Sequence, residues 1–128
     1  MTGGGVITID GKAFDVPVIK LERQAEFLDK YAERVQSGEL KRELIGVYYN
    51  YSLELGATSN KEEYHALWDK LTEPKEFHQV TLPDNMGMYS FTAYVAGVKD
   101  SIIYAKDNKR IMDGLTCDFI ARAPARRA

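Results

Sequence analysis

The chain has 128 residues, of which 45% are hydrophobic and 28% charged, so its composition is that of an ordinary globular domain. Its 17 basic and 19 acidic side chains give a net charge of −2, which excludes the overall basic excess typical of nucleic-acid-binding proteins. A chain of this length can bury one hydrophobic core without disulfides or metals.

The single cysteine, Cys117, rules out an intrachain disulfide and favours a reducing compartment. No apolar run approaches the roughly 18 residues that a membrane span requires. Residues 1–5 end in three glycines and lack the basic and apolar regions of a signal peptide. We therefore expect a flexible leader at 1–5, a protein that is cytoplasmic where it is made, and no membrane partner.

The first elements along the chain form a predicted β-hairpin. Residues 6–9 are β-rich, Asp10-Gly11 is a strong turn signal, and residues 14–21 form a second β-rich run. Pro17 lies inside the second run and predicts an edge strand or a bulge there.

Residues 22–36 fit two structures. Apolar residues recur every three or four positions, which is typical of a helix: Leu21, Ala25, Leu28, Ala32 and Val35. However, Phe27 and Tyr31 fall beside this stripe, and the turn signal Ser37-Gly38 leads directly into a strand. We favour a strand-like arm that pairs across Ser37-Gly38 with the next segment, although periodicity alone favours the helix.

Residues 40–55 form the clearest strand of the sequence. Apolar side chains alternate with polar or small ones from residue 45 onward: Ile45, Val47, Tyr49, Tyr51, Leu53 and Leu55. This period of two predicts one core-facing side, with Tyr48 pointing away from the core that takes Tyr49 and Tyr51. A strand of about 15 residues is well above the usual five or six, so we expect its overhang to need a partner.

A helix and three or four strands complete the chain. Ser59 and Glu62 have capping-box spacing, and Pro74 ends the helix. Its apolar stripe is Tyr64, Leu67, Trp68 and Leu71. Strands are predicted at 76–82, 89–95, 98–105 and 115–121, with a polar turn at 106–109.

This order of elements predicts the α+β class: an antiparallel β-sandwich or sheet with a long β-hairpin and one flanking α-helix. We expect a single domain over residues 6–124, followed by a basic C-terminal tail at 125–128.

The sequence contains no recognisable catalytic, cofactor or metal signature. His65 and His78 belong to no metal-binding motif and are expected to be partly exposed structural residues. Cys117 alternates with Leu115 and Phe119, as an inward-facing structural residue would. A small hydrolase would need a cleft that gathers His78 with Asp84 or Asp118, and nothing in the sequence brings them together. We therefore expect no enzyme activity, no cofactor, no metal and no small-molecule substrate.

The tip of the long hairpin is the candidate assembly interface. Mixed charges frame the Ser37-Gly38 turn, and such a tip can pair with a neighbouring subunit through main-chain hydrogen bonds. Tyrosine, as at Tyr48, is enriched at protein interfaces. The candidate interface residues are Tyr31, Arg34, Leu40, Arg42 and Tyr48.

The layout also carries a resemblance. An Ile-Thr-Ile-Asp-Gly run at 7–11 precedes a hairpin with the pattern Glu33-Arg34-x-x-x-Gly38-x-Leu40-x-Arg42-Glu43-x-Ile45-Gly46. A Tyr-rich strand, the helix with Tyr64 and Trp68, a strand with Phe77 and Val80, and the closing strand 115–120 follow. This layout, over residues 6–124, resembles small tail-associated structural proteins of phages and prophages of Gram-positive bacteria. Its order of elements is similar to the tail-tube and baseplate-hub fold.

The resemblance implies a non-enzymatic building block of the virion tail, made in the bacterial cytoplasm and carrying no cofactor. In that fold a β-sandwich with one flanking helix assembles into rings, and an extended hairpin contacts neighbouring subunits. The implied partners are other copies of the chain and other tail proteins. The alternative is a small monomeric adaptor, or a module that binds one host factor.

Overall fold

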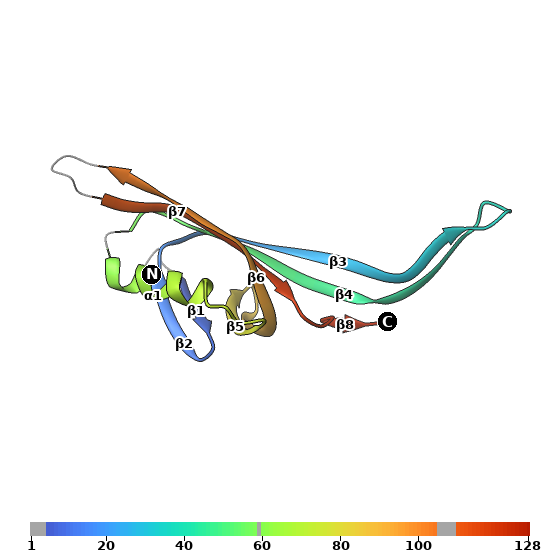
Figure 1. Ribbon diagram of the computed structural model, residues 1–128. Helices are drawn as coiled ribbons and strands as arrows, with labels where there is room; N and C mark the ends of the chain where they lie inside the picture. Colours follow the sequence, from blue (N-terminus) through green and yellow to red (C-terminus); the bar gives the residue numbers. More distant parts are fainter. Residues whose placement is uncertain (1–4, 59, 105–109) are drawn as a thin grey trace.

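The structure is a computed structural model that describes residues 5–58, 60–104 and 110–128 (Figure 1). Four strands come first: β1 (Gly5–Ile9), β2 (Lys12–Val16), β3 (Val18–Arg34) and β4 (Leu40–Leu55). Helix α1 (Lys61–Leu71) is followed by β5 (His78–Asp84), β6 (Gly87–Tyr104), β7 (Arg110–Ala121) and β8 (Arg126–Arg127). All the strands belong to one sheet in the order β2-β1-β5-β6-β7-β4-β3, and β8 pairs with β4.

The predicted α+β class is wrong. Strands make up 70% of the described residues, every strand pairing is antiparallel, and the single helix has 11 residues, so the fold is nearly all-β. The prediction counted one short helix as a full structural layer. The few buried residues of this helix cover only a small part of the sheet. The expected layout of a sheet with one flanking helix is loosely compatible with the structure.

The first hairpin forms as its turn residues predict. Asp10 and Gly11 have φ angles of 53° and 84°, and Ile9 pairs with Lys12 across them. Two positive φ angles define the hairpin turn that Asp-Gly favours. The predicted run 14–21 is divided at Pro17 into the end of β2 and the start of β3, because proline has no N–H to continue the ladder.

Strand β6 bends the sheet and thereby creates the core. Its residues up to Ala93 pair with β5, while those from Ala93 onward pair with β7, so Ala93 is the corner (Figure 1). The bend lets β1, β2 and β5 share one core with β4 and β7. The buried core residues are Ile7, Ile9, Phe14, Val16, Tyr51, Leu53, Leu55, Tyr64, Leu67, Leu71, Val80, Leu82, Ala93, Leu115, Cys117 and Phe119.

The two strands predicted at 89–95 and 98–105 form a single strand, β6, within the described residues. The register with β7 shifts between Ala96 and Lys99, and Gly97 has a φ of 64°. A bulge with glycine in the left-handed region continues a strand although the alternation of the sequence breaks there. Residue 105 and the polar turn predicted at 106–109 lie outside the described residues.

Helix α1 packs against the core through the apolar stripe that the sequence predicts. Tyr64, Leu67 and Leu71 are buried and Trp68 is partly buried against the core. The N-cap is Asn60, whose side chain accepts a hydrogen bond from the Glu63 N–H at 3.2 Å. The N-cap was therefore predicted one residue too early, and the Glu63 carboxylate accepts from the Asp15 N–H instead of closing a capping box. Ser59 lies outside the described residues.

The structure selects the strand for residues 22–36. Strand β3 runs without interruption to Arg34 and pairs along its length with β4, which the sequence placed correctly at 40–55. Tyr51 is buried and Tyr49 packs against the core, whereas Tyr48 faces the other way with its cross-strand partner Glu26. The predicted orientation of these three tyrosines is confirmed, whereas Ile45, on the same predicted core-facing side, is 39% exposed.

The packing of α1 predicts a contrast between two substitutions on the same helix. Leu67→Ala removes a fully buried side chain and should lower the free energy of unfolding by about 2–5 kcal/mol. His65→Ala, at a side chain that is 76% exposed, should change it by less than about 0.5 kcal/mol. Urea denaturation of both variants checks this, and equal losses would mean that α1 does not pack through this stripe.

Candidate functional site

The outer part of the β3–β4 hairpin, residues 24–50, projects from the body of the molecule, and we call it the arm (Figure 1). Strand β7 pairs with β4 only from Tyr51 to Glu54. Beyond Tyr51, β4 has β3 on one side and, among the described strands, only the two-residue β8 on the other, at Gly46 and Val47. The arm is therefore a two-stranded ribbon over most of its length.

Two irregularities shape the arm. The pairing register shifts between Leu28 and Asp29 and again between Asp29 and Tyr31. Such bulges bend and twist a ribbon, and Figure 1 shows the outer half of the arm turning away from the line of its inner half. The tip turns at Gly38, whose φ is 87°.

The arm exposes large apolar side chains that its own fold does not cover. Their exposed fractions range from 39% to 59%, and they are Phe27, Leu28, Tyr31, Leu40 and Ile45. A two-stranded ribbon has two faces and no core, so it cannot bury these side chains by itself. Apolar groups gathered in this way on one element mark a contact surface.

All five candidate residues lie in the arm, but they do not form one patch. Arg34 pairs with Leu40, so these two side chains share a face, whereas Tyr31 is opposite Glu43 on the other face. Tyr31 and Leu40 are each 49% exposed and available for contact. Tyr48 lies near the base of the arm, in a shallow hollow of about 190 Å³ that it shares with Leu28 and Ile120.

The two candidate arginines are held within the arm. Arg34 donates a hydrogen bond from Nη1 to the carbonyl oxygen of Gly38 at 2.9 Å, which fastens the tip turn. Arg42 donates from Nε to Asp29 at 2.5 Å, and its guanidinium lies 5.8 Å from the centre of the Phe27 ring. Both arginines are therefore engaged in contacts within the arm, and these contacts stabilise it.

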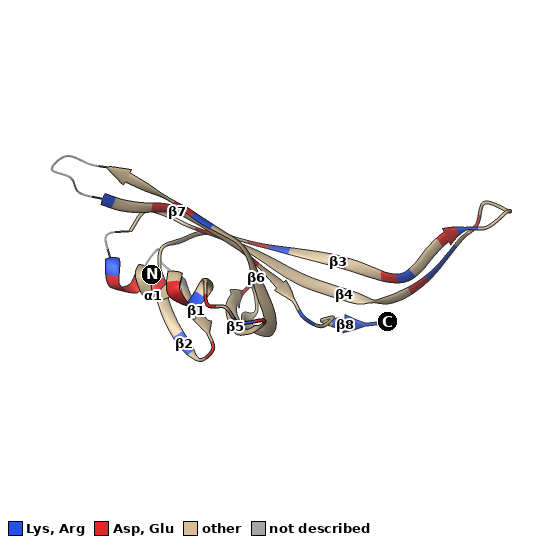
Figure 2. Ribbon diagram, viewed as in Figure 1, with Lys and Arg blue, Asp and Glu red and all other residues tan. Residues whose placement is uncertain are grey.

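Charges of both signs line the arm, as predicted for the tip (Figure 2). One ion pair is Arg42–Asp29, and another joins Lys30 to Glu43 at 3.9 Å with both side chains more than half exposed. Exposed pairs of this kind contribute about 0–1 kcal/mol each. The sequence missed Leu28 and Ile45 as exposed apolar residues, because its helical and strand patterns assigned both to a buried face.

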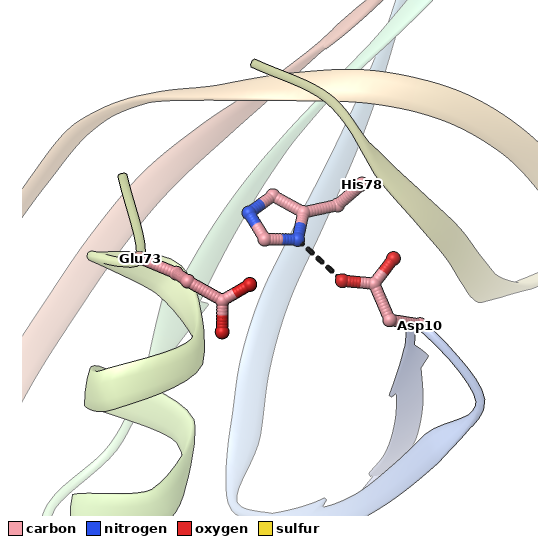
Figure 3. Close-up of side chains that lie close together, drawn as sticks. All are labelled: Asp10, Glu73 and His78. Atoms are coloured by element: carbon pink, nitrogen blue, oxygen red, sulfur yellow. Dashed lines mark hydrogen bonds and ion pairs between the residues drawn. The ribbon is translucent and has the colours of Figure 1, made fainter. Parts of the chain in front are cut away.

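A second cluster combines residue types that can bind metals. His78 is buried, and its Nδ1 lies 2.6 Å from Oδ2 of Asp10 in the β1–β2 turn. Figure 3 shows the carboxylate of Glu73, from the end of α1, turned toward the same imidazole. Each of Asp10, Glu73 and His78 places one potential ligand atom within 4.8 Å of the others. The sequence expected a partly exposed His78, and this is wrong, because Asp10 supplies the partner that makes its burial tolerable.

Two lysines already neutralise this cluster. Lys70 Nζ lies 3.2 Å from Glu73 Oε2 and 3.8 Å from Asp10 Oδ2, and Lys75 Nζ lies 3.2 Å from Asp10 Oδ2. Two carboxylates and two ammonium groups leave no net negative charge to attract a cation. The arrangement joins the β1–β2 turn, the end of α1 and the start of β5, so we assign it a structural role.

Asp10 is the centre of this network. Its burial alone would raise its pKa, but hydrogen bonds from His78, the Gln79 N–H and Lys75 outweigh burial and hold the pKa well below the ordinary value. The Gln79 N–H donates to Oδ1 at 2.8 Å. Since an ionised carboxylate only accepts hydrogen bonds, the proton of the contact with His78 is on Nδ1.

The groups considered for catalysis lie in separate surroundings. Asp84 pairs with Arg23 at 2.9 Å, Asp118 accepts a hydrogen bond from Ser52 at 2.7 Å, and His78 pairs with Asp10. Cys117 is 2% exposed, as predicted for an inward-facing residue, and its burial raises its pKa to about 12. A thiol with this pKa is not a nucleophile at neutral pH.

None of the helices in the described ranges combines the length and the apolar character needed to cross a membrane. In comparisons with known proteins, no family profile matches the chain, and no curated protein matches it significantly.

The Asp10 network predicts how stability depends on pH. Because the pKa of Asp10 is depressed in the folded state, its contribution is present above the ordinary carboxyl pKa and is lost as the pH falls toward the folded value. Asp10→Asn keeps the shape and tolerates the positive φ, but should lower the free energy of unfolding at pH 7 by about 1–3 kcal/mol. It should also flatten the loss of stability below about pH 4.

Chemical denaturation at several pH values measures both effects. The matched control is Asp69→Asn on the exposed face of α1, where the carboxylate is 65% exposed. Its pH profile should follow that of the unsubstituted protein. An Asp10→Asn profile that also does so would contradict the central role of Asp10.

Proposed function

We propose that the chain is a non-enzymatic structural subunit of a phage or prophage tail, which assembles with further copies and with neighbouring tail proteins through its arm. The observation that carries this proposal is the arm itself, a long two-stranded ribbon with exposed apolar side chains on both faces. The resemblance of the sequence layout to tail-tube and baseplate-hub proteins supplies the tail context. The virion tail is accordingly the proposed location.

An isolated two-stranded hairpin is marginally stable in water, and packing against other surfaces is what stabilises it. In this molecule, the apolar side chains from Phe27 to Ile45 contribute little while exposed. Burying half of a large apolar side chain contributes about 1 kcal/mol at the usual coefficient of about 25 cal/mol per Å². Five such residues along the arm therefore provide a substantial gain on assembly, which favours a subunit over a free monomer.

Two open strand edges support assembly by strand pairing. Among the described residues, β3 is the last strand of the sheet, so one side of its backbone has no strand partner there along Val18–Arg34. In the described part of the chain, β6 beyond Ala93 likewise pairs only with β7. Pairing the β3 edge of one copy with the β6 edge of the next is a head-to-tail contact, and head-to-tail contacts close into rings when the rotation permits.

The charges on the β3 edge favour pairing in one register over random aggregation. Lys20, Glu22 and Lys30 lie along it, and all three side chains are more than half exposed. Charged residues, lysine above all, are the usual protection of an edge strand against indiscriminate pairing. A partner edge must match these charges, so the contact favoured is one between specific copies.

Assembly through the arm predicts a specific sensitivity to charge. Leu40→Glu or Tyr31→Glu should raise the concentration for half-maximal assembly by at least about tenfold, the equivalent of about 1.4 kcal/mol. Each replaces an exposed apolar side chain by a charge that the interface would have to desolvate. Met86→Glu, at a residue that is 90% exposed on the β5–β6 turn, is the matched control and should have little effect.

Size exclusion with light scattering over a concentration series measures this. A 14.5 kDa mass at every concentration would contradict self-assembly and favour the monomeric adaptor. Equal effects of Leu40→Glu, Tyr31→Glu and Met86→Glu would instead show that assembly does not use the arm.

A further inference from the structure

The C-terminal segment crosses from the body of the molecule to the arm. Arg122 is anchored in the body, where its N–H donates to the Thr92 carbonyl at 2.9 Å and its guanidinium lies 4.6 Å from the centre of the Phe77 ring. Four residues later, β8 pairs with Gly46 and Val47 of β4 (Figure 1). The basic tail expected at residues 125–128 thus contains a strand of the sheet.

The C-terminal backbone packs closely against β4 at Gly46 and Val47, and we call this position the seat. A Cβ atom at position 46 would lie 2.6 Å from the Arg126 carbonyl oxygen and 2.7 Å from Cβ of Pro124, and real Cβ atoms do not approach this closely. Gly46 has no positive φ that would require glycine. The close approach of the C-terminal backbone is therefore the structural reason that glycine fits at this position.

The segment is nevertheless held weakly. Outside the β8 ladder, its backbone bonds to the arm are Ala125 N–H to the Val47 carbonyl at 2.9 Å and Ala128 N–H to the Ile45 carbonyl at 3.3 Å. Arg126 and Arg127 are exposed, and residues 122–128 contribute nothing to the buried core. Since each backbone hydrogen bond contributes little net stability, the segment can leave the arm without disturbing the core.

We infer that residues 123–128 exchange between copies, so that the C-terminal segment of one copy occupies the Gly46–Val47 seat on the arm of its neighbour. This inference rests on the proposed self-assembly. The occupant is a second copy of this segment because the seat already accepts it, with the Pro124 ring and the Arg126 carbonyl against Gly46. Exchanging identical elements preserves every contact, so it adds linkage between subunits at little cost.

The geometry also sets a limit on the exchange. Six residues beyond Arg122 span at most about 20 Å when extended. The exchange therefore requires the Gly46–Val47 position of a neighbouring arm to lie within that distance of Arg122. Next to the seat, Leu40–Leu44 pair only with β3 among the described strands, so no other described strand obstructs the approach to Gly46 and Val47.

A disulfide across the seat tests the exchange. Val47 and Arg126 are register partners, so the double variant Val47→Cys/Arg126→Cys can form a cross-strand bond. After oxidation of assembled protein, we expect covalent dimers and larger multimers on a non-reducing gel, and monomers after reduction. Cys117 competes little, because it is buried with a pKa near 12. Thr81→Cys/Ser90→Cys, across the β5–β6 hairpin, is the control and should give only intramolecular bonds.

The outcomes separate this inference from the proposed function. Only intramolecular bonds in protein that light scattering shows to be assembled would overturn the exchange and leave self-assembly standing. A monomer at every concentration would overturn both.

A substitution at the seat supplies a second test. Gly46→Ala should weaken assembly at least tenfold in concentration, because it displaces the segment from every arm. Gly56→Ala is the matched control, since its Cβ would meet the exposed Ile19 side chain at 3.1 Å and the Pro17 carbonyl oxygen at an ordinary 3.7 Å. Unchanged or stronger assembly of Gly46→Ala would overturn the exchange.

Discussion

The backbone hydrogen bonds of the arm are the constraint on which the rest of the structure depends. Each residue of a strand carries one donor and one acceptor, and a strand at the edge of a sheet leaves half of them without a strand partner. Beyond Tyr51, β3 and β4 pair with each other, and β8 covers two residues of the outer edge. The arm therefore presents open edges together with exposed apolar side chains, and a second chain can satisfy both.

The body of the molecule makes this arm possible. The bend of β6 at Ala93 places β1, β2 and β5 against β4 and β7, and the resulting core holds the inner end of the hairpin through Leu53 and Leu55. The Asp10–His78 contact fixes the first hairpin to the start of β5, and the Lys70–Asp10 ion pair fixes it to the end of α1. A rigid base of this kind lets a long ribbon project in a defined direction.

Sequence reasoning succeeded where burial imposes a clear period. Residues 49–55 alternate because one side of this part of β4 faces the core, and the α1 stripe recurs every three or four residues for the same reason. Strand β3 was ambiguous because its outer part is exposed on both sides, so no period of two is imposed on it. The class was wrong because the sequence shows that a helix is present but not how little of the sheet it covers.

Other features left no sequence signal. The Asp10–His78 pair joins residues 68 positions apart, and only the fold brings them together. Strand β8 has two arginines and no apolar alternation, so it was taken for a solvated tail. Of the five residues proposed for the interface, Arg34 and Arg42 were chosen for their charge near the tip, yet that charge is engaged by Gly38 and Asp29.

Hydrogen exchange of the β3 amides at low and high protein concentration tests the central claim most directly. If a second chain completes the arm, the amides of Val18–Arg34 that point away from β4 should exchange rapidly in dilute protein and at least tenfold more slowly in concentrated protein. Amides of Thr116–Phe119 in β7, which lies there between β4 and β6, should keep the same rate at both concentrations. Equal β3 exchange at both concentrations would contradict the account, because it would mean that the arm is complete within a single chain.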